Sequence, residues 1–452
     1  MRSVYSPFVE CWYTPRLLIR RNAPWLQDKV LSISREYIQN LIEYSGLHKR
    51  SIADLRQELH GMKSGKLNEW FSGLRRIMED FHSRRLAFMV EQLRESIGPK
   101  AYCYDSPPWL GALEPFLKKS ALYHEKMVVP DTLFSLVPPE GQLGDYSQEF
   151  PFWRMLTDAL GYTIELEPWV EAGFVEIMIP PHYWGAIQAS MDEICEEDAR
   201  DEHWRNAALI DEDDEIAGED IIRKWIKTIR MMWSGPLIKR RGGERAFAEN
   251  VAFSLPSRFC GEAALAASSL GLAPVTESKH AHRLLGLWLQ RRNQRLGRDV
   301  KASQGIVDLG LEEVGFIQGL PPRKILEIRD SEEISFKNFR REWAKTCSEI
   351  ESMPWDATFP SEVSTLWNDR LSPSIREVKQ DISYLRKKLG VGAGLVSLSI
   401  VSTVVSPSIP SVALSILSSV PALIGGTSVL DYLEKMKEIK RSSIYFFYRL
   451  GA

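Results

Sequence analysis

The sequence lacks the short motifs that mark common hydrolases and metalloenzymes. It contains no HExxH, no GxSxG and no cysteine paired with a histidine at a useful spacing. Its cysteines are also scattered, with no CxxC pair: Cys11, Cys103, Cys195, Cys260 and Cys347. An odd, dispersed set in a long chain favours buried thiols in a reducing compartment over disulfides or a zinc site.

A strong excess of charge and a secretory leader are missing as well. The formal net charge is -3 over 452 residues, so binding to nucleic acid or acidic membranes would need a local patch. The first 22 residues hold four arginines and a glutamate, and no apolar segment followed by small residues interrupts them. We therefore expect a cytoplasmic protein, with membrane association as an open addition.

Length and composition predict a folded protein of two or three domains. Hydrophobic residues make up 44% and charged residues 26%, which is ordinary for globular chains. We predict a mixed α/β, predominantly helical fold. Its expected parts are a helical N-terminal region (1–110), an α/β core with an acidic insertion (111–302) and a helical C-terminal region (303–452). Gly, Pro and Ser residues over 98–108 indicate the first boundary.

Two apolar runs that end on acids dominate the predicted core. Met127–Val129 is a compact strand-like run that Pro130 stops, and Asp131 follows it. Far downstream, residues 262–277 predict a small-residue helix, a stop at Gly271, a short strand and then Glu277. Because both runs join helices, we predict neighbouring parallel strands in one buried sheet. Ligand sites lie outside the carboxyl ends of such strands.

These two stretches resemble the first and late motifs of PIN-like nuclease domains. Val128-Val-Pro-Asp131-Thr132 is similar to the family's first strand, and residues 263–278 are similar to its late helix, Gly turn and strand. The resemblance implies a parallel-sheet core that holds Mg²⁺ or Mn²⁺ with carboxylates and cleaves RNA through metal-activated water. It implies Asp131 and Glu277 as metal ligands, with Glu171 and Glu262 completing the catalytic set.

The same stretches depart from the family pattern, which indicates a degenerate site. The late acid normally stands two residues after the Thr, where this chain has Ser278. The acid at the start of the late helix falls near Cys260, about half a turn from Glu262. Displaced acids leave a divalent ion with too few oxygen ligands. We therefore predict that nuclease activity is weak or absent.

The order of the chain also resembles uncharacterised bacterial proteins, some of which belong to anti-phage (antiviral) defence systems. The resemblance includes Leu122–Asp131, Trp169–Val175 and the closing residues Ile444–Leu450. It implies a bacterial defence or regulatory protein. Two functions stay open on the sequence: action through a protein partner, self-association or a membrane, and a metal-dependent ribonuclease.

Two charged stretches have alternative interpretations. A basic helix over 283–301 could bind a nucleic-acid backbone or could be a packed helix with a charged outer face. Its candidate contacts are Arg291, Arg292, Arg295 and Arg298. The acidic run Asp211–Glu215 could bind a divalent cation, but it lacks the Gly and Glu spacing of a calcium loop, and a solvated loop is favoured.

The C-terminal region contains an uncharged stretch from Leu389 to Leu430, 42 residues long. Pro407 and Pro410 divide it, so we predict two antiparallel helices, each roughly 17 to 19 residues, with basic residues outside both ends. This apolar hairpin is either core or a membrane or partner contact. The contact residues that we expect are Leu395, Ile400, Val404 and Leu417.

Overall fold

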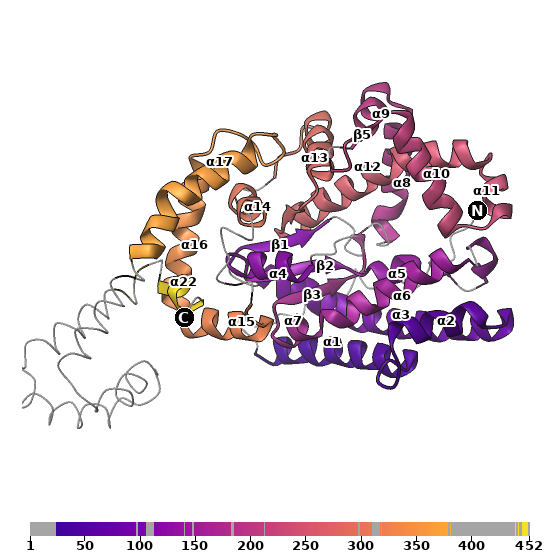
Figure 1. Cartoon of the computed structure of the whole chain (residues 1–452), viewed down its shortest axis with the longest axis horizontal. Helices are drawn as coiled ribbons and strands as arrows, with labels where there is room; N and C mark the ends of the chain where they lie inside the picture. The colour runs from indigo at the N-terminus through magenta and orange to yellow at the C-terminus, as the bar shows by residue number, and fades with distance from the viewer. Residues whose placement is uncertain are drawn as a thin grey trace, which may run out of the picture. The chain divides into compact units, whose positions relative to one another are not determined.

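A computed structural model describes residues 24–380, apart from 96–97, 105–112, 140, 147–148, 182–184, 212, 297–298, 310–316, 318 and 378–379, together with 439, 442 and 445–450. The described part is mainly helical and contains a small parallel sheet (Figure 1), which confirms the mixed α/β class. The chain divides into two compact units. The larger comprises residues 1–309 with 351–360, and the smaller comprises 310–350 with 361–452.

Three helices open the larger unit, as expected for the helical N-terminal region: α1 (Pro24–Ser45), α2 (Ile52–Gly61) and α3 (Ser64–Glu95). Ser51 caps α2 by accepting from the backbone N–H of Asp54, and the Asp54 carboxylate accepts from the Ser51 backbone in return. Helix α1 packs along α3, and α3 also contacts the sheet at β3.

The sheet has the strand order β3-β2-β1-β6, and every pairing in it is parallel. Its strands are β1 (Lys100–Cys103), β2 (Lys126–Pro130), β3 (Val175–Met178) and β6 (Ala273–Val275). The two runs that end on acids thus share one buried parallel sheet. They are not neighbours, because β1 lies between them and pairs with both.

Strand β1 lies within residues 98–108, the segment in which Gly, Pro and Ser residues indicate a boundary and no strand is predicted. Yet Ala101, Tyr102 and Cys103 are fully buried and pair with Met127 and Val128 on one side and with β6 on the other. Three apolar residues are too few to show a periodicity, so the strand is specified by its two partners.

Short helices connect and cover the strands of the larger unit. They are α4 (Leu113–Ala121), α5 (Thr132–Leu136), the 3₁₀ turn Leu143–Asp145, α6 (Phe150–Glu165), α7 (Glu167–Glu171), α8 (Gly185–Arg200), α9 (Glu202–Ala208), α13 (Lys279–Arg291) and α14 (Val300–Asp308). A two-stranded ribbon, β4 (Ile210–Asp211) with β5 (Ile216–Ala217), brackets the acidic run. In the view of Figure 1, α1 to α3 lie below the labelled strands of the sheet, and α12 and α13 lie above them.

The long helix α12 (Glu244–Leu270) leads into β6 and packs against α8, α10 (Glu219–Met232) and α11 (Gly235–Arg240). Gly271 ends it with φ 65°, the left-handed conformation that glycine adopts without a Cβ penalty. The predicted stop at Gly271 is confirmed. The strand that follows, β6, runs in the same direction as β2, so both strands end at the same edge of the sheet.

The smaller unit contains α15 (Pro322–Ser331), α16 (Glu333–Ser348) and the terminal α22 (Tyr445–Leu450). Helix α17 (Phe359–Leu366) enters this unit and continues into a π-helical turn, Trp367–Leu371. Trp343 of α16 packs edge-on against Trp367 with ring centroids 5.9 Å apart. The predicted hairpin 389–430, with Leu395, Ile400, Val404 and Leu417, lies outside the described residues.

Candidate functional site at the carboxyl edge of the sheet

The carboxyl edge of the sheet is where the two candidate metal ligands lie. Because all strands are parallel, the residues that follow β2 and β6 leave the sheet at the same edge. Asp131 follows β2, and Thr276 and Glu277 follow β6. Strand β1 separates them. Both acids therefore lie at the carboxyl edge of the sheet, as expected for residues that follow parallel strands. Their side-chain contacts determine what each can do.

Asp131 is enclosed by the protein. Its exposed fraction is 1%, and it caps α5 by accepting from the backbone N–H of Phe134 at 3.2 Å. The Tyr37 hydroxyl donates to its Oδ2 at 2.8 Å, and His82 Nε2 contacts the same oxygen at 2.8 Å. Both carboxylate oxygens thus have partners from within the fold. We call Tyr37, His82 and Asp131 the Asp131 cluster.

The helices α1 and α3 bring these partners together. Tyr37 stacks on Phe81 with ring centroids 3.9 Å apart, and His82 follows Phe81 directly on α3. Nearer the protein surface, Arg84 of α3 binds Glu36 of α1 through two 2.9 Å hydrogen bonds. Aromatic stacking inside and a bidentate ion pair outside therefore fix the two helices side by side, which orients both donors toward Asp131.

Burial sets the protonation states in the Asp131 cluster. Burial, followed by the charge and hydrogen bond of Asp131, raises the pKa of Tyr37 well above its usual value, so Tyr37 is a neutral donor. Burial is also the largest effect on His82, and it lowers the pKa of that imidazole despite the opposing attraction of Asp131. His82 is therefore neutral at physiological pH, and its Nε2 can donate to Asp131 only in the Nε2–H tautomer.

Two buried arginines lie beside the cluster, and each has its own partners. Arg75 donates to the carbonyl oxygens of Phe134 and Val137, and its guanidinium lies 3.9 Å from the centroid of the Phe134 ring. Arg85 forms a buried ion pair with Glu176 of β3, which Lys126 of β2 also contacts at 3.3 Å. Arg75 also pairs with Glu79 at 2.8 Å, so each guanidinium already has a carboxylate partner of its own.

Glu277 belongs to a second group of polar residues at the same edge. Lys119 of α4 donates to Glu277 Oε1 at 2.7 Å and to the carbonyl oxygen of Val307 at 2.6 Å. Gln304 of α14 donates to the Thr276 carbonyl at 2.7 Å and to Asp308 Oδ1 at 2.6 Å. These bonds attach α4 and α14 to the end of β6.

Asp308 is the most perturbed acid of this second group. Burial is the largest effect and raises the pKa of its carboxyl to about 7, Glu277 raises it further, and the Gln304 hydrogen bond and the charges of Lys119 and Lys279 oppose the rise. Its Oδ2 atom is buried and has no hydrogen-bond partner in the described part of the chain. Such a carboxyl exchanges a proton near neutral pH.

The other two predicted catalytic acids occupy different surroundings. Glu262 lies on α12, is 3% exposed, and accepts a long hydrogen bond of 3.4 Å from the Tyr102 hydroxyl. Glu171 is exposed at the end of α7, where its backbone carbonyl accepts from Arg35 of α1. Within the described ranges, no three His, Cys, Asp or Glu side chains are placed to hold a metal ion. The residues present therefore do not fit the Mg²⁺ or Mn²⁺ site that the resemblance implies.

The basic helix predicted over 283–301 ends at Arg291 in the structure, and two of the candidate nucleic-acid contacts at this end face inward. Arg291 binds Asp201 at 2.6 Å and Asp198 at 3.3 Å, and Arg292 binds Asp198 at 3.0 Å. Asp198 is fully buried and also accepts from Ser257. Both arginines thus neutralise an internal carboxylate. Arg295 is exposed, and Arg298 lies outside the described residues.

The acidic run is likewise bound to neighbouring elements. Lys224 pairs with Asp211 at 2.9 Å and with Asp214 at 2.5 Å. The Asp213 carboxylate accepts from Ser278 Oγ and from the backbone N–H groups of Lys279 and His280 at the start of α13. Its negative charge therefore stabilises a helix N-terminus, as expected from the helix dipole.

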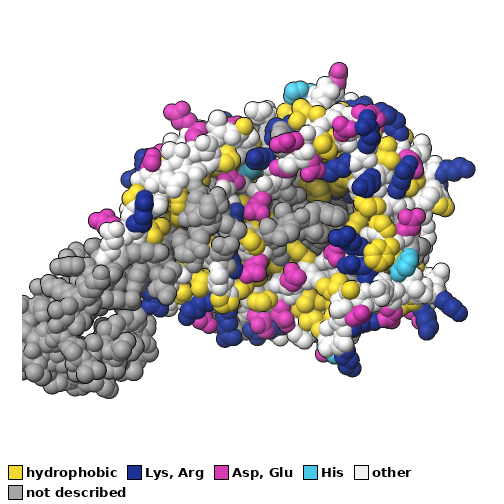
Figure 2. All heavy atoms as spheres, in the orientation of Figure 1, with side chains coloured by type: hydrophobic (Ala, Val, Ile, Leu, Met, Phe, Trp, Pro, Cys, Tyr) yellow, Lys and Arg dark blue, Asp and Glu magenta, His cyan; other side chains and the backbone are white. Residues whose placement is uncertain are grey.

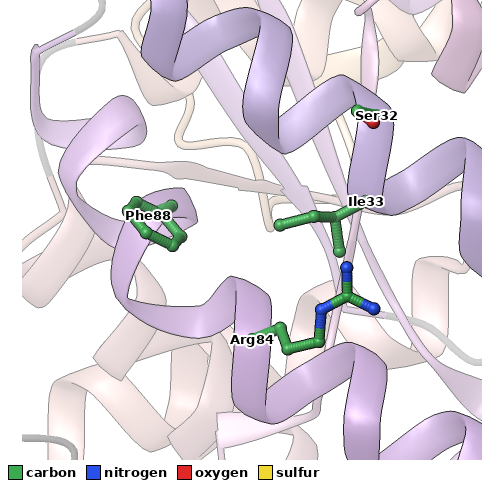
Figure 3. A pocket seen from close by; sticks show the side chains of 4 residues that line it. All are labelled: Ser32, Ile33, Arg84 and Phe88. Atoms are coloured by element: carbon green, nitrogen blue, oxygen red, sulfur yellow. The ribbon is translucent and has the colours of Figure 1, made fainter.

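A surface hollow of about 480 Å³ lies between α1 and α3, lined by Ser32, Ile33, Arg84 and Phe88. Figure 3 shows Ile33 and Phe88 facing the space from the two helices, with the Arg84 guanidinium below Ile33. Because Arg84 already binds Glu36 and Asp80, its charge is compensated. The one charged side chain among these four lining residues is therefore already paired.

Sequence reasoning missed the residues that surround the two acids. No pattern in the sequence marks His82 or Tyr37 as a partner of Asp131. The one local signal was the adjacent pair Lys118 and Lys119 in the helix that leads into β2. Both lysine side chains are buried in the structure. Among the helices that the structure describes, none is long and apolar enough to cross a membrane.

No protein-family model, no curated protein and no solved structure matches the chain.

Proposed function

We propose that this chain is an intracellular bacterial defence or regulatory protein that acts through contacts with a protein partner, a second copy or a membrane. In this proposal its PIN-like core is a scaffold without nuclease activity. The observation that carries the proposal is the state of Asp131, the first acid of the expected metal site. It is buried, and both of its oxygens accept hydrogen bonds from Tyr37, His82 and the Phe134 backbone.

The energetics favour this internal use of Asp131. A divalent cation would have to displace the Tyr37 hydroxyl and His82 from Oδ2. Each buried donor left without an acceptor costs about 1 to 3 kcal/mol.

The element proposed for partner or membrane contact is the uncharged stretch Leu389–Leu430. An apolar surface of this length has to be covered by protein or lipid. Basic residues just outside both ends, Arg386 to Lys388 and Lys435 to Arg441, suit an anionic membrane surface. Ile400 and Leu417 are central in the two expected arms, so a charge at either position tests the contact.

One experiment tests the scaffold part of the proposal. Purified full-length protein is incubated with structured and single-stranded RNA in Mn²⁺, next to Asp131→Asn and a matched Asp80→Asn control on the exposed surface of α3. We expect no cleavage above background from any of the three. Robust cleavage that Asp131→Asn abolishes and Asp80→Asn retains would overturn the scaffold assignment.

A second experiment tests the contact element. Ile400→Asp and Leu417→Asp are compared with the wild type by circular dichroism, liposome flotation and native mass. We expect folded variants that lose association with liposomes or with a second copy. Unfolding of both variants would assign the stretch to the core, because an unpaired charge would be buried there. Normal folding with normal association would refute the contact role.

A metal-dependent ribonuclease is the second candidate. One observation favours it: Asp131 and Glu277 both follow parallel strands of one sheet and leave it at the same edge. The RNA cleavage experiment above distinguishes the two candidates, since only the ribonuclease predicts activity that depends on Asp131 and on a divalent cation.

A further inference from the structure

The segment from Ile221 to Gly243, which covers α10 and α11, is strongly basic. It contains seven basic residues and no acidic residue, in a chain whose formal net charge is -3. All seven side chains are exposed: Arg223, Lys224, Lys227, Arg230, Lys239, Arg240 and Arg241. Figure 2 shows Lys and Arg side chains, with some acidic ones among them, over the part of the larger unit where Figure 1 places α10 and α11.

The packing of α10 and α11 turns these charges outward. Ile222 and Ile229 of α10 and Ile238 of α11 are buried in one apolar cluster with Phe247 and Phe253 of α12. Residues 223, 227 and 230 lie three and four positions apart, so they share the opposite face of α10. From residue 223 to residue 230 this stripe extends about 10 Å at 1.5 Å per residue.

Four of the seven basic side chains have acidic partners from outside the segment. Arg223 pairs with Asp220, Lys224 with Asp211 and Asp214, Arg230 with Glu244, and Arg240 with Asp145. Lys227, Lys239 and Arg241 form no ion pair with any residue that the structure describes. Exposed ion pairs contribute little and exchange readily, so the paired groups can also turn toward an external anion.

We propose that α10 and α11 form a docking surface for the phosphate backbone of a nucleic-acid duplex. A duplex carries one charge per about 1.7 Å of its axis, and Lys and Arg bind it by releasing condensed counterions. The surface has the matching charge and offers long, flexible donors on a helical face. Contacts of this kind position a protein on a duplex without reading the base sequence.

The same surface is poorly suited to two other anionic partners. A membrane-bound helix inserts exposed apolar side chains, whereas no large hydrophobic residue is exposed between Ile221 and Gly243. A single strand stacks its bases on exposed aromatic rings. Here Trp225 and Trp233 are half-buried, and Trp233 packs against Phe247 with ring centroids 5.1 Å apart. The charged face without an apolar or aromatic platform favours a duplex.

Removal of the three unpaired charges tests the proposal in the full chain. The triple variant Lys227→Gln, Lys239→Gln, Arg241→Gln is compared with a matched control that removes three exposed lysines elsewhere, Lys49→Gln, Lys63→Gln, Lys66→Gln. Binding to a short labelled DNA duplex is followed by fluorescence anisotropy between about 50 and 200 mM salt. Single-stranded RNA and phosphatidylserine vesicles serve as the other two probes.

We expect the wild type and the control to bind the duplex with a salt dependence that the triple variant reduces. Each lost phosphate contact lowers the slope of log K against log salt by about 0.9, so three contacts lower it by roughly 2 to 3. Affinity at low salt should fall at least tenfold in the triple variant. Absence of duplex binding by the wild type would overturn the proposal. Equal losses of duplex affinity in both triple variants would also overturn the proposal. Tighter binding to the vesicles or to the single strand than to the duplex would overturn it as well.

Discussion

Tyr37→Phe removes a single hydroxyl from the Asp131 cluster and leaves the rest of the packing in place. The ring of Tyr37 stacks on Phe81 at 3.9 Å, and the phenylalanine that replaces it can keep that contact. The lost interaction is one 2.8 Å hydrogen bond to a buried carboxylate. Hydrogen bonds to charged groups contribute about 1.5 to 3 kcal/mol, and His82 and the Phe134 N–H remain on Asp131. We therefore expect a loss of about 2 kcal/mol in the free energy of unfolding.

The matched control is Tyr102→Phe. Tyr102 is equally buried and also donates to a buried acid, Glu262, but over 3.4 Å. A bond of this length is weak, so we expect a loss below about 1 kcal/mol. Urea unfolding near neutral pH, followed by tryptophan fluorescence, compares both variants with the wild type. A loss in Tyr37→Phe no larger than that in Tyr102→Phe would refute the reasoning.

The dependence of stability on alkaline pH tests the same prediction in a second way. The folded-state pKa of Tyr37 is raised above its unfolded value of about 10. Stability from a raised pKa is fully present below pH 10 and is lost as the pH rises through the folded value. Phenylalanine has no proton to lose. The stability difference between wild type and Tyr37→Phe should therefore narrow above about pH 10, and a difference that widens there would contradict this account.

Three further predictions follow from single residues. Burial raises the pKa of Asp308 to about 7, so the stability that its protonated carboxyl contributes is lost as the pH rises from about 4 to 7. In urea titrations, Asp308→Asn should therefore be more stable than the wild type at pH 8, by at most about 4 kcal/mol, and nearly equal to it at pH 4. Burial lowers the pKa of His282 to about 3, so the wild type should lose stability as the pH falls below 6.5. Between pH 7 and 4, His282→Phe should lose up to about 3 kcal/mol less than the wild type. Parallel curves of unfolding free energy against pH would contradict this. Gly271→Ala should cost about 1 to 2 kcal/mol in thermal or urea unfolding because φ is 65° there, and an unchanged midpoint would show that the turn relaxes.

The elements that sequence reasoning could predict are those specified by local patterns. The apolar spacing of 25–44 gives α1, the Ser51-to-Asp54 capping box starts α2, and Gly271 ends α12. Asp131 is placed correctly at the carboxyl end of a buried strand for the same reason, because a short β-branched run, a proline and an acid are adjacent in the chain. Local patterns of this kind act within about one or two turns.

The contacts that define the candidate site are long-range, and no local pattern contains them. Tyr37 and Asp131 are 94 residues apart in the sequence, and His82 and Asp131 are 49 apart. The same limit explains β1, whose three buried residues become a strand only between β2 and β6. It also explains Arg291 and Arg292, which read as a basic helix face until Asp198, about 90 residues earlier, is placed beneath them.

The two features proposed here depend on electrostatics in opposite environments, and salt separates them. The Asp131 cluster is buried, so its hydrogen bonds gain from a low dielectric and are barely screened by ions. The charges of α10 and α11 are exposed, and their attraction to a polyanion falls steeply as salt rises. A rise in salt should therefore weaken duplex binding while leaving the stability loss of Tyr37→Phe unchanged. No hydrogen bond or ion pair links the Asp131 cluster to Lys227, Lys239 or Arg241 in the described structure, so the effects should add when Tyr37→Phe is combined with the triple charge variant. Non-additive effects of the combined substitutions would mean that the Asp131 cluster and the docking surface are energetically coupled.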